Sequence, residues 1–327
     1  MAGTALSTTP WTPTAKRWQR RVVWPEAQDR PGVKTAPAAS VLRASTDDAG
    51  RPHHSPNQGS QRRGLLTTVS SAPGAPASPR RRLLGLGALA VIGLASLLAA
   101  PVERIMPLPL PTMTVRVLAI VQPAILTAGA LLVGLLLGPK VGLDAPILAG
   151  RLRLEARSAP QLRALGTASL IVAIVAAGLL YGYEQNLATF TAGLSGEGRA
   201  TLEAFQPPLV TRVLYGGLVE EIISRWGLMT LFVWLIARIA RRRGAPATWV
   251  YWSGAALAAF LFALGHLPLL FSLFDAPPMT LIATVLALNA IIGFGFGWLF
   301  ARYGLEAAML SHALTHLIAA SLSGGLA

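Results

Sequence analysis

Long apolar runs succeed one another along the chain from residue 83 onward. An α-helix rises 1.5 Å per residue, so each run is about long enough to cross a hydrocarbon core roughly 30 Å thick. The fourth run is longer than a straight crossing needs, which predicts a strong tilt or an interfacial start. The seven runs cover approximately 83–100, 118–137, 165–181, 209–240, 250–271, 281–300 and 305–322.

None of these runs shows the alternation of apolar and polar residues that marks a barrel strand. A helix, in contrast, satisfies its own backbone hydrogen bonds in lipid. The pattern therefore predicts an all-α fold, a polytopic transmembrane helical bundle with about seven spans. Residues 1–82, rich in Pro, Ser and Arg, lack apolar periodicity and are predicted to form a disordered tail. We divide the remainder into N-terminal transmembrane helices at 83–200 and a transmembrane core at 201–327.

The composition supports a membrane protein. Of 327 residues, 53% are hydrophobic and only 13% are charged, whereas a soluble domain has about a quarter charged residues. The formal net charge of +14 comes from arginines between the apolar runs and in the tail, so we do not expect a nucleic-acid partner. The chain has no cysteine, which excludes disulfides, thiolate nucleophiles and cysteine-ligated metals.

Basic residues near the runs predict the orientation of the chain. They gather at Arg80–Arg82, between Lys140 and Arg163, and between Arg238 and Arg243, all on one predicted side of the bilayer. Positively charged short loops stay in the cytoplasm. We therefore expect a multi-pass protein of the cell membrane with its N-terminus in the cytoplasm and its C-terminus outside.

Ionisable residues inside the runs are few and occur late in the chain. A charge at the centre of a spanning helix costs about 2.5–3.5 kcal/mol on insertion scales, so each such residue is a functional candidate. Their positions predict one polar site among the last four helices. The candidates are Glu220, Glu221 and Arg225 in the fourth run, His266 in the fifth, and His312 and His316 in the seventh.

The two adjacent acids are expected to differ. Glu221 and Arg225 are four residues apart and can pair on one helix face, whereas Glu220 is turned away and is free to act as a base toward water. An alternative is that both acids and the arginine form a buried ion network without chemistry. Two acids with one arginine leave an excess negative charge, which favours a further positive or metal partner.

The histidines allow more than one interpretation. A single histidine in an apolar helix, such as His266, also fits a hydrogen-bonded packing role, although Pro268 predicts a bend beside it. His312 and His316 are four residues apart, a spacing that suits two ligands of one metal ion. Counted from the cytoplasmic ends, His266 falls late in its run and His312 early. Either the predicted edges are wrong or the seventh helix begins deeper.

Together these motifs resemble the CPBP family of intramembrane proteases, also called the ABI family, which includes type II CAAX prenyl proteases. The first family motif, two glutamates followed by three residues and an arginine, matches Glu220, Glu221 and Arg225. The second, a phenylalanine with a histidine four residues later, matches Phe262 and His266. The third matches His312, but His316 occupies the position of the usual asparagine. The resemblance covers roughly 200–322.

The resemblance implies a role for each matched residue. Glu220 would activate the attacking water, His266 would assist it or hold the developing oxyanion, and His312 with the residue four later would complete the oxyanion environment. Glu221 and Arg225 would be supporting residues. Family members are often labelled metalloproteases, yet similar enzymes use a glutamate without a metal. We favour the glutamate mechanism and leave open a zinc ion held by Glu220, His266, His312 and His316.

The favoured function is therefore that of an intramembrane endopeptidase, CAAX-protease-like, acting on a membrane-associated peptide or protein. The alternative is a non-catalytic membrane adaptor or bacteriocin self-immunity protein that keeps the fold, to which the change at His316 gives some weight. A proton-relay transporter is a third possibility, but no internal repeat supports it. Nothing in the sequence identifies the substrate or indicates that it is prenylated.

Overall fold

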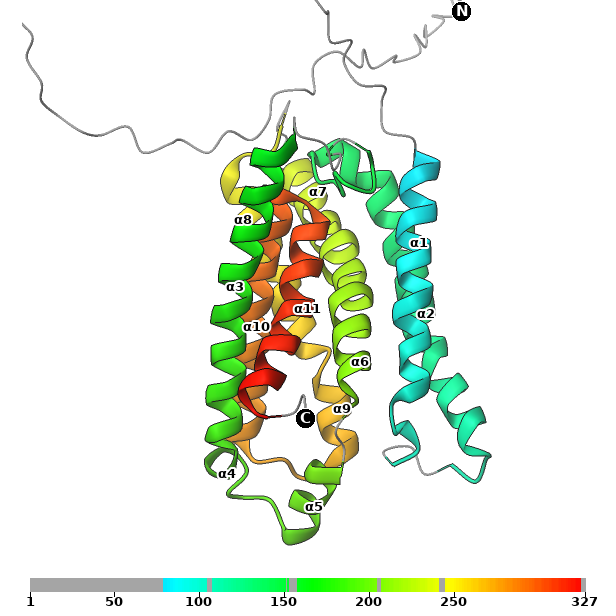
Figure 1. Cartoon of the computed structure of the whole chain (residues 1–327), viewed down its shortest axis with the longest axis vertical. Helices are drawn as coiled ribbons and strands as arrows, with labels where there is room; N and C mark the ends of the chain where they lie inside the picture. The colour runs from blue at the N-terminus through cyan, green and yellow to red at the C-terminus, as the bar shows by residue number, and fades with distance from the viewer. Residues whose placement is uncertain are drawn as a thin grey trace, which may run out of the picture. The chain divides into compact units, whose positions relative to one another are not determined.

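The structure is a computed structural model that describes residues 79–104, 108–150, 152, 158–204, 207–240 and 245–324. Residues 1–78 of the predicted disordered tail lie outside the described residues. The described residues form helices and turns and contain no strand, and seven helical stretches among them are long and apolar enough to cross a membrane. The predicted all-α class and the predicted number of spans are thus confirmed (Figure 1).

The spans follow the predicted order along the chain. They are α1 (Pro79–Ala95) with η1 (Ser96–Ala99), α2 (Thr112–Val141), α3 (Ala159–Gln185), a fourth span from α6 (Leu209–Thr211) to α7 (Thr230–Ile239), α8 (Thr248–Leu264) with α9 (Leu267–Leu273), α10 (Met279–Tyr303) and α11 (Leu305–Leu322). The short helices η2 (Val102–Arg104), α4 (Leu187–Phe190) and α5 (Gly196–Ala204) lie in the connections. Successive spans run in opposite directions and their number is odd, so the beginning of α1 and the end of α11 lie at opposite ends of the bundle (Figure 1).

The helices extend beyond most of the apolar runs. The first begins at Pro79 instead of Leu83, because a proline suits the first helical turn, where its missing N–H has no partner to lose. Arg82, which we had assigned to the tail, is therefore part of α1. Its side chain is buried and its Nε lies 2.8 Å from an oxygen of Asp144.

The fourth span is a continuous helix whose middle is π-helical. Two π segments, η4 (Arg212–Glu220) and η5 (Ile222–Met229), flank Glu221 between α6 and α7. A π-helix bonds each N–H to the carbonyl five residues earlier, and such turns are rare and frequent at functional sites. The unusual length of the fourth run thus corresponds to a change of helix type, which we had attributed to tilt or an interfacial start.

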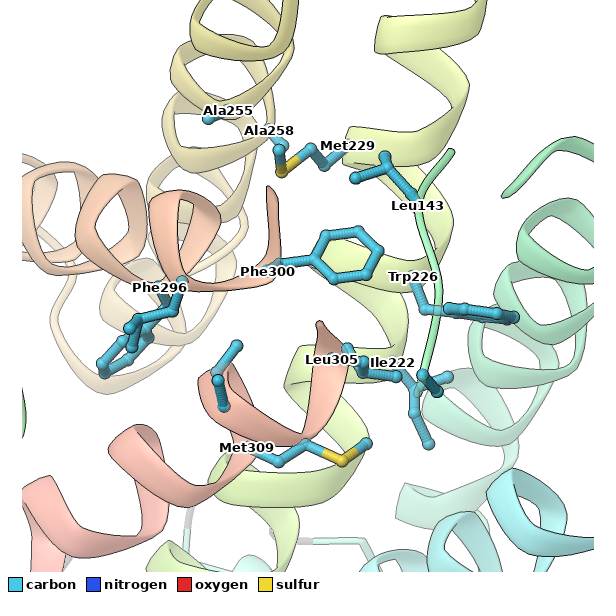
Figure 2. Packing of buried hydrophobic residues seen from close by; sticks show 14 of the residues in the cluster. Leu143, Ile222, Trp226, Met229, Ala255, Ala258, Phe296, Phe300, Leu305 and Met309 are labelled. Atoms are coloured by element: carbon cyan, nitrogen blue, oxygen red, sulfur yellow. The ribbon is translucent and has the colours of Figure 1, made fainter. Parts of the chain in front are cut away.

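One side of this span forms the centre of the apolar core. Ile222, Trp226 and Met229 are fully buried and pack with Phe300 and other side chains of the neighbouring helices (Figure 2). Helix α2 approaches closely because Gly134 faces Trp226; a Cβ at this glycine would lie 2.2 Å from the indole Nε1. The core therefore fixes the rotation of the span that carries both candidate acids.

The start of α11 is held by the loop between α2 and α3, residues 142–150. Gly304, with φ of 99°, allows a tight turn in which a Cβ would lie only 2.2 Å from Cδ of Pro146. The Leu305 N–H donates to the Asp144 carbonyl at 3.1 Å, and Leu305 is fully buried. The loop therefore covers the turn at which α11 begins.

Candidate functional site

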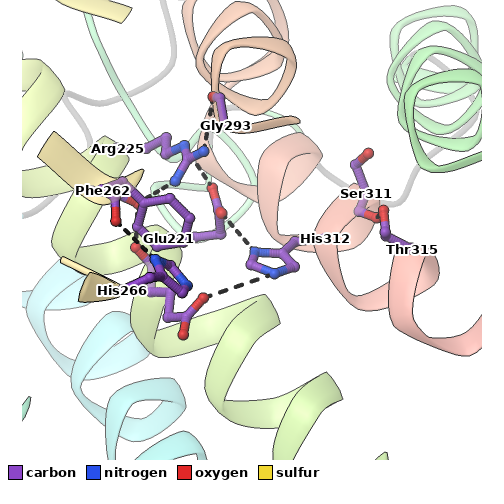
Figure 3. Close-up of polar contacts among 10 residues, drawn as sticks. Glu221, Arg225, Phe262, His266, Gly293, Ser311, His312 and Thr315 are labelled. Carbon is purple, nitrogen blue, oxygen red and sulfur yellow. Dashed lines mark hydrogen bonds and ion pairs between the residues drawn. The ribbon is translucent and has the colours of Figure 1, made fainter. Parts of the chain in front are cut away.

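The candidate site lies where the π-helical part of the fourth span meets α8, α10 and α11. In Figure 3 the side chains of Glu221, Arg225, His266 and His312 converge on one region. Their helices pack directly against one another, η4 against α11 and η5 against α8 and α10. Residues separated by about ninety positions in the sequence are thus brought into one polar cluster within an apolar bundle.

Arg225 is almost completely buried, with 1% of its surface exposed. One terminal nitrogen donates a hydrogen bond of 2.8 Å to the carbonyl of Gly293, and the other donates to Ser224 Oγ. The guanidinium also lies between two rings, 5.1 Å from the centre of Phe262 and 5.4 Å from that of Phe296. Such cation–π contacts stabilise a desolvated charge. Arg225 is therefore held rigidly and has little capacity to bind a ligand.

Glu221 has no exposed surface, and both of its oxygens are in use. Oε2 lies 3.2 Å from Arg225 Nε, so the predicted pairing is present, and Oε1 lies 2.8 Å from Nδ1 of His312. A carboxylate that accepts from Nδ1–H fixes both the tautomer and the orientation of the ring. Glu221 thus links the buried arginine to the histidine of α11.

His312 is positioned from several sides. Its ring stacks on Phe296 with a centroid distance of 4.8 Å and packs against the ring of His316 at 5.1 Å. With Nδ1 bonded to Glu221, the other ring nitrogen, Nε2, lies 3.9 Å from Oε2 of Glu220. That distance exceeds a direct hydrogen bond and suits a small bridging molecule such as water.

Glu220 is the less restrained of the two acids. Its side chain is 23% exposed, whereas that of Glu221 is 0% exposed. Its backbone carbonyl accepts a hydrogen bond from Ser224 Oγ, but within the described part of the chain its carboxylate has only the long contact with His312. Burial and partners thus separate two adjacent glutamates that have the same chemistry in isolation.

His266 lies at a break between α8 and α9, the bend that Pro268 predicts. The His266 N–H bonds to the Ala263 carbonyl, which leaves the carbonyl of Phe262 to accept from the ring Nδ1 at 2.9 Å. The ring also packs edge-on against Phe262 at 4.8 Å. Nδ1 is therefore occupied, and Nε2 is the nitrogen left for other contacts.

The zinc set that the sequence left open is not assembled in this geometry. Among the described residues, no group of three or more His, Asp or Glu side chains is placed to hold a metal ion. Glu221 occupies one ring nitrogen of His312, and the Phe262 carbonyl occupies one of His266. We therefore derive no chemical step through a metal.

Several contributors to the site were not expected from the sequence. Phe296 and the Gly293 carbonyl hold Arg225, and Ser224 connects that arginine to the backbone of Glu220. A buried serine or a glycine carbonyl carries no recognisable sequence signal. Gly297 lets α10 pack closely on α8, because a Cβ at Gly297 would lie 2.9 Å from that of Ala255.

These features define a polytopic helical membrane protein with a buried acid and histidine site. Residues 204–318 match the family model of the type II CAAX prenyl endopeptidase Rce1-like proteins. This part of the chain is thus an Rce1-like domain, which confirms the family resemblance of the motifs. Comparisons with curated proteins and with solved structures found no match.

Proposed function

We propose that this protein is an intramembrane endopeptidase in which Glu220 activates the water that hydrolyses a peptide bond near the membrane. One observation carries the proposal: Glu220 is a partly exposed carboxylate that accepts no hydrogen bond from the described residues, and it lies 3.9 Å from a histidine nitrogen whose ring is fixed by Glu221. A general base must have a free carboxylate within reach of its water. The Rce1-like domain supports a protease in general.

In the proposed reaction, Glu220 takes a proton from water while the water oxygen forms a bond to the substrate carbonyl carbon. A proton on Nε2 of His312 would make that nitrogen a donor to the resulting oxyanion. His266 contributes its Nε2 from the opposite helix. When the C–N bond breaks, Glu220 passes its proton to the departing amine, so that a carboxylic acid and an amine result.

The alternative of a buried ion network explains only part of the site. Such a network accounts for Glu221 and Arg225, whose charges compensate each other. It leaves the Glu220 carboxylate with only the long contact to His312 among the described residues, although an acid within a membrane span is costly. The non-catalytic adaptor remains the second candidate, because His316 occupies the position of the family's usual asparagine.

The substrate class that we propose is a membrane-associated peptide or protein. The basic ends of the spans are proposed to face the cytoplasm, as the positive-inside rule predicts. CAAX processing is the activity named for the matched family model, and for this chain it is one hypothesis within the broader proposal. One cleavage experiment tests both the general endopeptidase proposal and the CAAX hypothesis if lipidated and unmodified peptides are compared.

The test is cleavage of membrane-derived and lipidated peptides by the purified protein in detergent. Glu220→Gln removes the proposed base and is expected to lower the rate by about 10²–10⁴-fold. His266→Ala is expected to lower it as well. Glu197→Gln, in α5 outside the spans, is the matched control and should cleave like wild type.

Two results would contradict the proposal. If wild type cleaves none of the peptides while its fold is intact, the adaptor is favoured. If Glu220→Gln cleaves as fast as wild type, the site hydrolyses its substrate without this base, and the assignment of Glu220 is wrong.

A further inference from the structure

The fourth span is packed differently on the two sides of Glu220. After this residue, six of the eight residues of η5 are buried. Before it, only three of the nine residues of η4 are buried, and two of these are Gly216 and Gly217. The side of Glu220 toward the end of the span is therefore closed, whereas the side toward its beginning is only partly covered.

The neighbouring helices change at the same level. In α11, most residues of 305–312 are buried, and most of 313–318 are partly exposed. In α10, one residue of 279–292 is buried, compared with five of the eight in 293–300. In α8, the buried residues lie mainly within 250–259, before His266. Because successive spans run in opposite directions, the buried halves of these helices all lie at one end of the bundle.

This end is closed by a set of side chains that we call the apolar plug, Trp226, Met229, Phe300 and Leu305. Each is at most 1% exposed, and they belong to one cluster (Figure 2). The loop at 142–150 covers the start of α11 at the same end. Protein interiors contain few voids larger than a water molecule. A peptide therefore cannot reach the site from this end unless the core opens.

The opposite end has a much smaller apolar cluster, made of Leu194, Leu270, Phe274 and Leu281 with partly buried neighbours. These residues come from the connection between α4 and α5, from α9 and its end, and from α10. Among the described residues, η4 and α11 contribute nothing to this cluster. The site is therefore open toward this end, on the side of the helix that carries its proposed base.

Charges distinguish the two ends of the bundle. Exposed basic residues from several spans gather at the end that the apolar plug closes: Arg80, Arg81, Lys140, Arg238 and Arg302. At the open end, Arg116 is paired with Glu103. Positively charged short loops stay in the cytoplasm. The closed end is thus the one that we proposed to face the cytoplasm.

We propose that the substrate reaches Glu220 from the non-cytoplasmic side of the membrane, and that it is a flexible segment of a polypeptide exposed on that side. The inference rests on the proposed function, because it takes the ligand of the site to be a peptide. A peptide tail confined to the cytoplasm would meet the apolar plug and is disfavoured as a substrate.

The depth of the site limits the form of this segment. Glu220 is eleven residues from Leu209, where the fourth span begins, which is at most about 16 Å at the rise of an α-helix. An extended peptide covers about 3.3 Å per residue. About five unfolded residues are thus needed between the cleaved bond and the nearest folded part of the substrate. A linker or chain terminus beside the membrane meets this requirement, and a folded domain does not.

Cysteine accessibility tests the direction of access without requiring cleavage. Because the chain has no cysteine, each single substitution introduces its only thiol. Tyr215→Cys places the thiol five residues before Glu220, in the partly exposed part of η4. Ala313→Cys places it on α11 at the open side of His312, and it provides the same test if the first variant does not fold.

Three further variants serve as references. Glu197→Cys in α5 marks the open end, and Arg238→Cys in the last turn of α7 marks the closed end. Ala308→Cys is the matched control for Ala313→Cys, because Ala308 has no exposed surface and lies on the plug side of His312. Its thiol should react from neither side of the membrane.

The full-length variants are produced in a bacterial inner membrane, and the charged thiol reagent MTSET is added to intact spheroplasts or to inverted vesicles. A permanent charge keeps the reagent from crossing the hydrocarbon core. Denaturation and a gel shift with maleimide–polyethylene glycol then measure the thiol that is left. Tyr215→Cys, Ala313→Cys and Glu197→Cys are expected to lose the shift in spheroplasts, and Arg238→Cys only in inverted vesicles.

The inference is overturned if Tyr215→Cys and Ala313→Cys react in inverted vesicles together with Arg238→Cys, or if they react from neither side while both markers react. It is also overturned if Glu197→Cys reacts only in inverted vesicles, because the open end then faces the cytoplasm. Access from outside in a protein that cleaves no peptide would support the inference and contradict the hydrolase. Cleavage in detergent combined with access from the cytoplasm would do the reverse.

Discussion

Nδ1 of His312 lies 2.8 Å from Oε1 of Glu221, and this contact separates the roles of the two adjacent glutamates. Glu221 is fully committed to a histidine on one side and an arginine on the other. Glu220 keeps a partly exposed carboxylate on the far side of the same imidazole. One acid is therefore expected to support the structure, and its neighbour to carry the chemistry.

Replacing the two acids should affect the stability of the protein to very different extents. Glu221→Gln leaves Arg225 as a buried charge without its counter-ion, a change that typically costs 3–5 kcal/mol. Glu220→Gln removes no buried ion pair and should leave the unfolding temperature nearly unchanged. Thermal unfolding in detergent measures both variants. Equal melting temperatures for the two would show that Glu221 is not the structural partner of Arg225.

Two neighbouring glycines of α10 provide a matched pair of substitutions. A Cβ at Gly293 would lie 3.0 Å from a terminal nitrogen of Arg225, whereas at Gly295 the nearest atom would be Cγ1 of Val172 at 3.4 Å. We expect Gly293→Ala to disturb Arg225, and with it Glu221, and to lower cleavage at least severalfold. Gly295→Ala should be tolerated. Loss of activity in Gly295→Ala alone would contradict this account.

Chelation should leave the activity unchanged. The described residues contain no group of three ligands placed for a metal ion, and the proposed steps use only protein side chains and water. Incubation with phenanthroline or EDTA followed by a cleavage assay is the measurement. Inhibition that is reversed by added zinc would instead support the metalloprotease interpretation and would require the side chains of the site to rearrange.

Glu103, in the connection between the first two spans, should titrate unusually low. Hydrogen bonds from Arg116, 2.7 and 3.0 Å long, lower the pKa of Glu103 from 4.5 to about 2. Because the folded pKa is depressed, the contribution of this pair to stability is complete above pH 4.5 and is lost as the pH falls through about 2. Carboxyl-carbon NMR should therefore show no titration of Glu103 between pH 3.5 and 7.

Arg116→Met provides the control for this measurement. Without the guanidinium, the pKa of Glu103 should return toward its ordinary value. A Glu103 resonance that titrates near pH 4.5 in the wild type would mean that the contact is not formed in solution.

The sequence predicted the spans and most of the site. Length and apolarity were sufficient to identify seven helices, because crossing a bilayer imposes both. The site candidates could be found because charge inside a membrane is costly and therefore rare. The pairing of Glu221 with Arg225 was expected from their spacing, whereas the contact of Glu221 with His312 was not predicted. The roles assigned to these residues in catalysis stay predictions until cleavage is measured.

Other features could not be read from the pattern. The π-helical segments depend on tertiary packing, and an apolar run has the same appearance for either helix type. The contribution of the Gly293 carbonyl is invisible because it belongs to the backbone.

The loop at 142–150 bears on how much of the chain must fold together to form the candidate site. Glu306, at the start of α11, accepts hydrogen bonds of 2.9 Å from the backbone of Ile147 and Leu148, and Asp144 in turn is paired with Arg82. These partners precede the segment 204–318 that carries the family signature. The helix that presents His312 is therefore anchored by residues outside that segment. The segment that identifies the family is thus smaller than the part of the chain that must fold together to align the site.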